Sequence, residues 1–280
     1  MTVATAAMSA ALVLGRRSAR AVRVARPEPG DGEVLIRVEG CGVCASSLPV
    51  WEGREWFSYP LAPGAPGHEV WGRTEDGRRV TALCYRGFAQ WDVAAADTVV
   101  ELPPELDDLP FPGEALACAA NVVRRARIGA HHRVAVVGMG FLGTAVARQI
   151  GDVAEVRRET ATEGTFDVVI EAAGTQGALD TASQLVGEGG RLVIAGFHQD
   201  GPRTVDLQGW NWRGIEVVNA HERRREAYVA GMRDAVRLAA AGVLDVEALV
   251  THVVPLDDLE RAFQLATTRP VGFVKAVVCP

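Results

Sequence analysis

Short apolar runs separated by glycine and proline turns characterise the first third of the chain. Residues 33–38, 79–84 and 89–93 are runs of this kind, and each contains β-branched or aromatic residues. Runs of this length bounded by turn-forming residues are typical of strands. We therefore expect a β-rich domain from residue 1 to about residue 122, opening with a loose segment and a first strand.

The pattern then changes to strand, glycine turn, helix and strand. Apolar runs at 134–137, 166–170 and 191–195 alternate with segments of helical character. Strands that alternate with helices predict a parallel sheet. The fold class is therefore α/β, with a Rossmann-like parallel domain at 123–249. The strand–helix–strand pattern of the tail, 250–280, indicates a return to the first domain.

Composition narrows the class of protein and its partners. The chain has 280 residues, 48% of them hydrophobic, and a net charge of −6. Its longest basic run is 223–225, so we expect no nucleic-acid surface. No run approaches the about 18 apolar residues of a membrane span, so we expect no membrane partner. Five cysteines do not suggest a disulfide framework, which makes a reducing cytoplasm the default location.

A glycine loop is the firmest single motif. Gly138, Gly140 and Gly143 follow a four-residue apolar strand and open a helix, with Phe141 and Leu142 between the last two glycines. Glycines allow the tight turn and the close backbone approach that a pyrophosphate on a helix N-terminus requires. The loop predicts nucleotide binding. A glycine-rich turn kept for packing alone is the alternative.

Three residues upstream of this loop could hold a metal ion. Cys44 ends the segment 40–44 after a strand, and His68 and Glu69 follow the turn-rich residues 65–67. A lone cysteine or histidine is usually structural, but all three occupy loop positions here. Catalytic zinc takes three protein ligands and leaves one position open for water or substrate.

The chain resembles the zinc-dependent medium-chain dehydrogenases/reductases, which include alcohol, sorbitol and threonine dehydrogenases. The resemblance covers nearly the whole chain and rests on residues 32–38, 41–44, 66–69, 114–119, 138–143, 166–174 and 272–278. It implies a GroES-like catalytic domain beside the Rossmann-like one, with the active site in the cleft between them. It also implies one catalytic zinc, a nicotinamide cofactor, a small-molecule substrate and a homodimer formed through the strand at 215–218.

The resemblance also implies roles for individual residues. Cys44 and His68 match the first two zinc ligands of the family. Glu69 matches the carboxylate that binds zinc or approaches it when ligands exchange. Glu114 lies 24 residues before the glycine loop, where sorbitol- and threonine-dehydrogenase-like members place their third ligand. Cys118, four residues later, is the alternative third ligand.

Two positions after Cys44 depart from the family pattern: Ser47, where many relatives have aspartate, and Pro49. Ser46 matches the hydroxyl residue that begins the proton relay of the family, but Pro49 stands where several relatives have a histidine that completes it. The relay therefore ends early, uses water, or has been abandoned. Trp51, Trp56 and Phe57 could wall an apolar substrate pocket or serve domain packing.

The segment 144–165 is too short for a complete dinucleotide fold, so at least one strand and one helix are missing. It can house one helix and one short strand, 153–156. If this is the second strand of the fold, Arg157 and Arg158 follow its carboxyl end and could meet a 2′-phosphate, which predicts NADP. These arginines could equally form an exposed turn. If the strand is instead a remnant of the third, the adenosine half-site is missing.

Two functions remain open at this level. The first is a zinc-dependent NAD(P) oxidoreductase that interconverts a secondary alcohol or polyol and its ketone. The second is a zinc-dependent non-redox enzyme, catalysing elimination, isomerisation or cyclisation, derived from a dehydrogenase that lost normal dinucleotide binding. The shortened segment and Pro49 motivate the second function.

Overall fold

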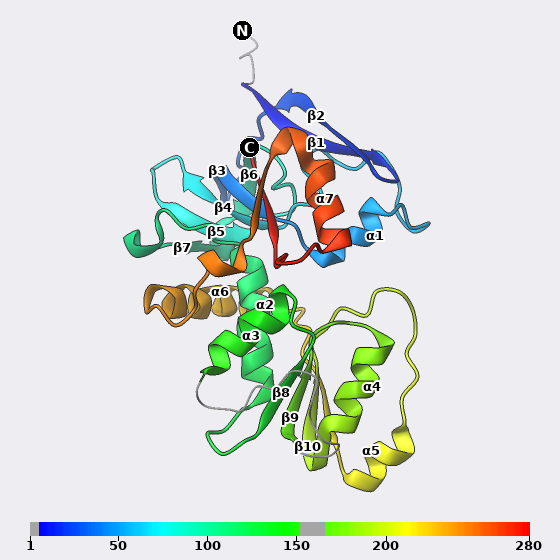
Figure 1. Ribbon diagram of the computed structural model, residues 1–280. Coiled ribbons are helices and arrows are strands. Elements are labelled where there is room, and N and C mark those ends of the chain that lie inside the picture. The colour runs from blue at the N-terminus through cyan, green and yellow to red at the C-terminus, as the bar shows by residue number, and fades with distance from the viewer. Residues whose placement is uncertain (1–5, 152–165) are drawn as a thin grey trace. The chain divides into compact units, whose positions relative to one another are not determined.

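The computed structural model describes residues 6–151 and 166–280 (Figure 1). The chain divides into two compact units. Unit 1 comprises Met1–Ala115 and Ala235–Pro280, and unit 2 comprises Leu116–Asp234. The strand expected at 153–156, and with it Arg157 and Arg158, lies outside the described residues.

Unit 1 contains a sheet in which the described residues form seven strands. Its order is β12-β13-β3-β4-β5-β7, with β6 paired to β3. These strands are β3 (Glu33–Gly42), β4 (Glu69–Thr74), β5 (Arg79–Leu83), β6 (Trp91–Ala95), β7 (Val99–Glu101), β12 (His252–Pro255) and β13 (Ala276–Cys279). The three strands expected at 33–38, 79–84 and 89–93 are thus confirmed as β3, β5 and β6, with shifts of a few residues at their ends.

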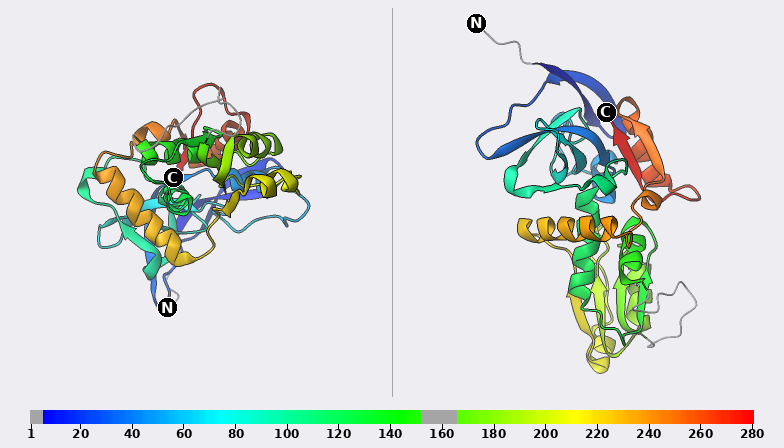
Figure 2. Two further views of the ribbon diagram at one scale, coloured as in Figure 1. Left: turned by 90° about the horizontal axis from the view of Figure 1, so that it is seen from below. Right: turned by 90° about the vertical axis from the view of Figure 1, so that its left-hand side faces the viewer.

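The C-terminal strand β13 joins the same sheet as the N-terminal strands. It pairs antiparallel with β3, where Val277 lies opposite Gly42. The preceding helix α7 (Leu259–Thr268) turns its apolar residues toward the core. A separate hairpin of β1 (Ala7–Gly15) and β2 (Ser18–Ala25) lies beside α7, and the backbone N–H of Ala19 donates to Glu260 there (Figures 1 and 2).

Aromatic stacking ties the short helix α1 (Leu48–Trp51) to this core. The rings of Trp51 and Phe263 are stacked with centroids 5.0 Å apart, and Phe88 meets Phe263 edge-on. Trp51 is only 2% exposed. Of the two roles expected for this residue, packing is therefore the one that the structure shows.

Unit 2 contains a four-stranded parallel sheet in the order β11-β10-β9-β8, as far as the structure describes it. The strands are β8 (Val134–Val137), β9 (Phe166–Glu171), β10 (Val186–Ile194) and β11 (Glu216–Asn219). The helices are α3 (Phe141–Ile150), α4 (Gln176–Leu185) and α5 (Leu207–Arg213), while α2 (Gly113–Ala126) and α6 (Arg225–Ala240) each contain a boundary between the units. The parallel α/β arrangement expected from the sequence is confirmed.

Long, uninterrupted apolar helices are missing from the described part of the chain. None of its helices has the length and hydropathy that crossing a membrane requires.

Candidate metal centre and dinucleotide loop

Adjacent strands of unit 1 bring Cys44, His68 and Glu69 together. Their potential ligand atoms all lie within 4.8 Å of one another. Cys44 follows β3 and Glu69 begins β4, and the antiparallel pairing of these strands places Gly42 opposite Glu69. A Cβ atom at Gly42 would lie 1.8 Å from a carboxylate oxygen of Glu69, so only glycine leaves room for that side chain.

Hydrogen bonds orient the first two of these donors. The Nδ1 atom of His68 lies 2.8 Å from the carbonyl oxygen of Pro66 and donates to it, which leaves Nε2 as the metal-binding atom. The hydroxyl of Ser46 donates to the Cys44 sulfur over 3.1 Å. Sulfur, imidazole and carboxylate donors form a set that fits zinc.

Negative charge gathers around His68. Burial lowers the pKa of its imidazole, but the hydrogen bond to Cys44 and the charges of Cys44, Glu114 and Glu69 outweigh burial and raise this pKa well above its usual range. Glu114 stands in the first turn of α2, outside the group of three described above. Its charge nevertheless helps to raise the pKa of His68. Cys118 follows one turn later on the same helix and is partly buried.

A buried lysine completes the surroundings of Glu69. The ammonium of Lys275 donates to both carboxylate oxygens of Glu69, at 2.9 and 2.7 Å, and lies 3.4 Å from the carbonyl oxygen of Val43. The two side chains are 4% and 1% exposed. Burial lowers the pKa of Lys275, but the charges of Glu69, Cys44 and Glu114 raise it overall.

The sequence interpretation assigned Lys275 no role. One signal was present, because Lys275 is the only charged residue in the apolar run 273–278. A charged residue that is fully buried must be paired, so its position in this run pointed to a buried partner.

The relay position after Ser46 is apolar. Pro49 lies within α1 and is buried together with the other residues of that helix. A proline side chain carries no group that can transfer a proton, so the hydroxyl of Ser46 has no protein successor at this position.

The glycine loop joins β8 to α3 in the strand–turn–helix context that its sequence predicts. Gly138 has φ +99°, and a Cβ atom there would lie 2.7 Å from the Cβ of Ala173. A Cβ at Gly143 would lie 1.9 Å from the carbonyl oxygen of Gly138. Gly140 caps the helix, whose first two residues are Phe141 and Leu142. Gly138 and Gly143 are therefore required by the close packing of the turn, and a turn of this kind at a helix N-terminus suits a phosphate.

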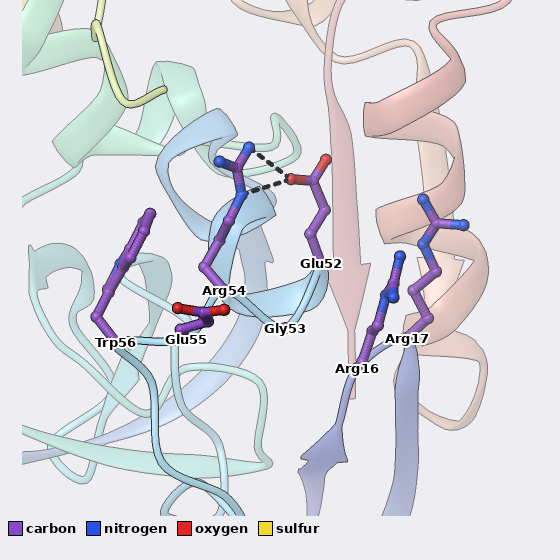
Figure 3. Close-up of a pocket in the computed structure, with 7 residues that line it drawn as sticks. All are labelled: Arg16, Arg17, Glu52, Gly53, Arg54, Glu55 and Trp56. Carbon is purple, nitrogen blue, oxygen red and sulfur yellow. Dashed lines mark hydrogen bonds and ion pairs between the residues drawn. The ribbon is translucent and has the colours of Figure 1, made fainter. Parts of the chain in front are cut away.

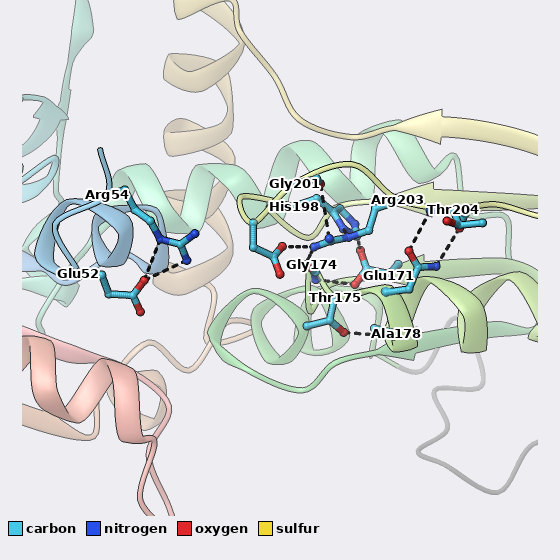
Figure 4. Close-up of polar contacts among 12 residues, drawn as sticks. Glu52, Arg54, Glu171, Gly174, Thr175, Ala178, His198, Gly201, Arg203 and Thr204 are labelled. Atoms are coloured by element: carbon cyan, nitrogen blue, oxygen red, sulfur yellow. Dashed lines mark hydrogen bonds and ion pairs between the residues drawn. The ribbon is translucent and has the colours of Figure 1, made fainter. Parts of the chain in front are cut away.

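Two histidines, His198 and His221, lie after β10 and β11. The Nε2 atom of His198 is 3.0 Å from a carboxylate oxygen of Glu171. The ring of His221 lies 6.1 Å from that of Phe197. His198 is therefore part of a polar network at the carboxyl ends of the strands, and it is not a free surface residue (Figure 4).

A hollow of about 390 Å³ opens elsewhere on unit 1 (Figure 3). Its lining consists of Arg16, Arg17 and residues 52–56. Arg54 donates to Glu52 and lies over the ring of Trp56, which is 64% exposed. The lining is mostly charged, so this hollow is not the apolar pocket that Trp51 and Trp56 were expected to wall.

Comparison with known families agrees with both halves of this description. The alcohol dehydrogenase GroES-like domain matches residues 30–158, and the zinc-binding dehydrogenase domain matches residues 146–271. These two descriptions confirm the GroES-like catalytic domain and the class of the second domain.

Individual relatives cover almost the entire chain. A 2-dehydro-3-deoxy-L-galactonate 5-dehydrogenase from Pseudoalteromonas atlantica is 26% identical, over 97% of this chain and 99% of the relative. That alignment spans 347 residues, more than the 280 of this chain, so part of the relative has no counterpart here.

Solved structures of related proteins share the fold. A thermostable alcohol dehydrogenase from Pyrobaculum aerophilum is 25% identical with a TM-score of 0.81, over 98% of this chain and 100% of that one. A Sinorhizobium meliloti structure bound to NADP has a TM-score of 0.82 at 22% identity, over 98% of this chain and 100% of that one.

The fold and the two domain matches define an alcohol dehydrogenase-like class of zinc-binding dehydrogenases. The chain belongs to the medium-chain dehydrogenase/reductase family, as an alcohol dehydrogenase-like oxidoreductase. Of the two functions left open by the sequence, the oxidoreductase is the one confirmed.

Proposed function

We propose that this enzyme oxidises a secondary alcohol in a small polar substrate, a polyol or a hydroxy acid, and reduces the matching ketone. The observation that carries the proposal is the group of Cys44, His68 and Glu69, in which the hydrogen bond to Pro66 leaves Nε2 of His68 available to a metal. Relatives named for galactonate and threonine, and a structural neighbour named for butanediol, support a substrate of this size and polarity.

Zinc at this site would supply a Lewis acid that stabilises negative charge on the substrate oxygen during hydride transfer. Cys44 and His68 are its first two ligands in this proposal, and Glu114 is the third. The ammonium of Lys275 holds the Glu69 carboxylate in place through hydrogen bonds to both of its oxygens. The hydroxyl of Ser46 accepts the substrate proton and passes it to water, because Pro49 offers no protein acceptor.

A substrate survey tests the reaction. Zinc-loaded protein with NAD⁺ or NADP⁺ should form reduced nicotinamide from at least one secondary alcohol among galactonate, threonine and 2,3-butanediol. A chelator should abolish this activity, and added zinc should restore it. Activity that survives complete zinc removal would contradict the proposal.

The third ligand is tested by paired substitutions on α2. Glu114→Gln and Cys118→Ser each replace a potential ligand by a residue of similar size. Zinc content per chain should fall in the Glu114 variant and survive in the Cys118 variant. The opposite pattern would make Cys118 the third ligand.

The cofactor is proposed to bind at the glycine loop, through Gly138, Gly140 and Gly143, with the backbone of Phe141 and Leu142 at the helix N-terminus. Arg157 and Arg158 are proposed to favour NADP through its 2′-phosphate. Alanine at both arginines should weaken NADPH binding about tenfold more than NADH binding in calorimetric titration. Equal effects on the binding of the two cofactors would contradict a role of these arginines in recognising the 2′-phosphate.

Assembly is proposed to be a homodimer through β11, which forms one edge of the described parallel sheet. Val217 on this strand is 40% exposed, so an apolar side chain at the edge of the sheet is available to a second copy of the chain. Light scattering should give a dimer, and Val217→Lys should shift it toward monomer. A monomeric native protein would contradict this proposal.

The five free thiols support a cytoplasmic location, where cysteines stay reduced.

A further inference from the structure

A buried carboxylate closes the end of β9 in unit 2. Glu171 is the last residue of that strand and is fully buried. One of its oxygens accepts from the backbone N–H groups of Ala173 and Gly174, at 2.8 and 2.6 Å. The other oxygen lies 3.0 Å from Nε2 of His198, in the loop after β10. The carboxylate therefore links the loops that follow two neighbouring strands.

An arginine turns this link into a closed ring (Figure 4). Nε of Arg203 donates to Nδ1 of His198 over 2.8 Å, and its Nη2 donates to the carbonyl oxygen of Gly174 over 2.9 Å. Asp200 also accepts from Arg203. Since Nδ1 of His198 accepts, the imidazole carries its proton on Nε2 and donates it to Glu171. We call the Glu171–His198–Arg203 set, closed through Gly174, the polar ring.

Backbone packing makes the two loops depend on one another. A Cβ atom at Gly174 would lie 2.6 Å from the carbonyl oxygen of Phe197, and one at Gly196 would lie 2.2 Å from the N atom of Gly174. The loop 172–174 also packs against the glycine loop, because a Cβ atom at Gly138 would lie 2.7 Å from the Cβ of Ala173. A displacement of the polar ring would therefore also displace the loops at the carboxyl ends of β8, β9 and β10.

The strand order says which part of a dinucleotide these loops face. In the six-stranded order 3-2-1-4-5-6, the glycine loop follows strand 1, and the half built from strands 1 to 3 holds the adenosine ribose. β8 carries the glycine loop, and β9, β10 and β11 follow it outward in that order. They occupy the places of strands 4, 5 and 6, so the loops after β9 and β10 belong to the half that receives the other mononucleotide.

From this placement we propose that His198 and Arg203 are positioning residues for the nicotinamide half of the cofactor. They act through the loops 172–174 and 195–198, whose backbone the polar ring holds in one conformation. A loop fixed before binding avoids the cost of ordering it when the cofactor arrives. The inference rests on the proposed NAD(P)-dependent function, and it adds a determinant of cofactor binding that lies outside the glycine loop.

Three variants separate the polar ring from a general effect on folding. His198→Leu removes both hydrogen bonds of the ring nitrogens. His198→Gln keeps one donor and one acceptor, and so serves as the conservative rescue. Arg191→Met is the matched control, because Arg191 forms an ion pair with Glu216 on the same sheet, toward the amino ends of the strands.

The measurements are calorimetric dissociation constants for NADH, NADPH and ADP-ribose, which lacks the nicotinamide. For His198→Leu we expect binding of the preferred dinucleotide to weaken about tenfold, and ADP-ribose binding to change less than about threefold. His198→Gln and Arg191→Met should bind both ligands nearly as the wild type does. In steady-state assays, His198→Leu should raise the KM for the cofactor more than it lowers kcat.

Each contrary result has a distinct meaning. Equal weakening of dinucleotide and ADP-ribose, or the same loss in Arg191→Met, would show a general loosening of the unit and overturn the positioning role. Unchanged binding by His198→Leu would overturn it as well. Wild-type protein that binds neither NADH nor NADPH would overturn the proposed function together with this inference.

Discussion

Removing the buried cation beside the candidate metal centre is the sharpest perturbation that the structure offers. Lys275→Met keeps the length of the side chain but leaves the Glu69 carboxylate without its partner. Both side chains lie almost wholly inside unit 1, and the ammonium donates to both carboxylate oxygens. Breaking a buried ion pair from one side leaves an uncompensated charge in a medium that solvates it poorly.

The expected cost is about 3–5 kcal/mol of unfolding free energy, the usual range when one partner of a buried pair is removed. Glu69→Gln combined with Lys275→Met leaves no net charge in the same space. This double variant should therefore be more stable than Lys275→Met alone, by roughly 1–3 kcal/mol. Zinc also matters, because the proposed ligand atoms of Cys44 and His68 lie within 4.8 Å of a Glu69 carboxylate oxygen. Zinc bound by them would partly replace the charge of the ammonium, so the loss should be smaller in zinc-loaded protein.

The assay is urea unfolding of the wild type, both single variants and the double variant, each with and without zinc. Circular dichroism and intrinsic fluorescence should be followed together, since a chain with two units can unfold in more than one step. The reasoning fails if zinc-free Lys275→Met lies within about 1 kcal/mol of the wild type. It fails equally if the double variant is no more stable than Lys275→Met.

Two further substitutions test the dinucleotide loop and the core. Gly143→Ala places a Cβ against the carbonyl oxygen of Gly138, so it should cost about 1–3 kcal/mol and abolish measurable NAD(P)H binding in titration. Gly177→Ala, on α4 with open space around it, should be neutral or slightly stabilising in the same measurements. Trp51→Ala should cost about 3–5 kcal/mol in thermal or urea unfolding because it empties a stacked core position, while exposed Trp56→Ala should cost less than about 1 kcal/mol. Similar losses for the two tryptophans would contradict the core assignment.

Local patterns account for what the sequence predicted well. The expected strands at 134–137 and 166–170 are β8 and β9, because short apolar runs bounded by turn residues specify their own conformation. The expected strand at 215–218 is shifted by one residue, to Glu216–Asn219. The glycine loop could be recognised locally, since Gly138 has a positive φ and Gly143 packs against the carbonyl oxygen of Gly138 within the motif.

Local patterns did not predict the contacts between segments that lie far apart in the chain. Residue types and expected loop positions singled out Cys44, His68 and Glu69, although Glu69 in fact begins β4. Nothing local revealed that Lys275, 206 positions away in the chain, bonds to Glu69 in the fold. The aromatic pattern likewise left the role of Trp51 open, and the stacking on Phe263 decided it.

The sequence by itself predicted the α/β class, several of the strands and the glycine loop, because each depends on residues close together in the chain. It also singled out Cys44, His68 and Glu69 as candidate metal ligands, from their residue types and the family resemblance. The tertiary structure decided the partner of Glu69 and the polar ring around Glu171, because each forms only when separate segments meet. The pairing of β13 with β3 brings the strand that follows Lys275 beside the one that precedes Cys44. Parallel alignment of β9 and β10 sets their carboxyl ends, and thus Glu171 and His198, side by side. A buried charge is stable only with such a partner, so these contacts follow from the fold and not from any single stretch of sequence.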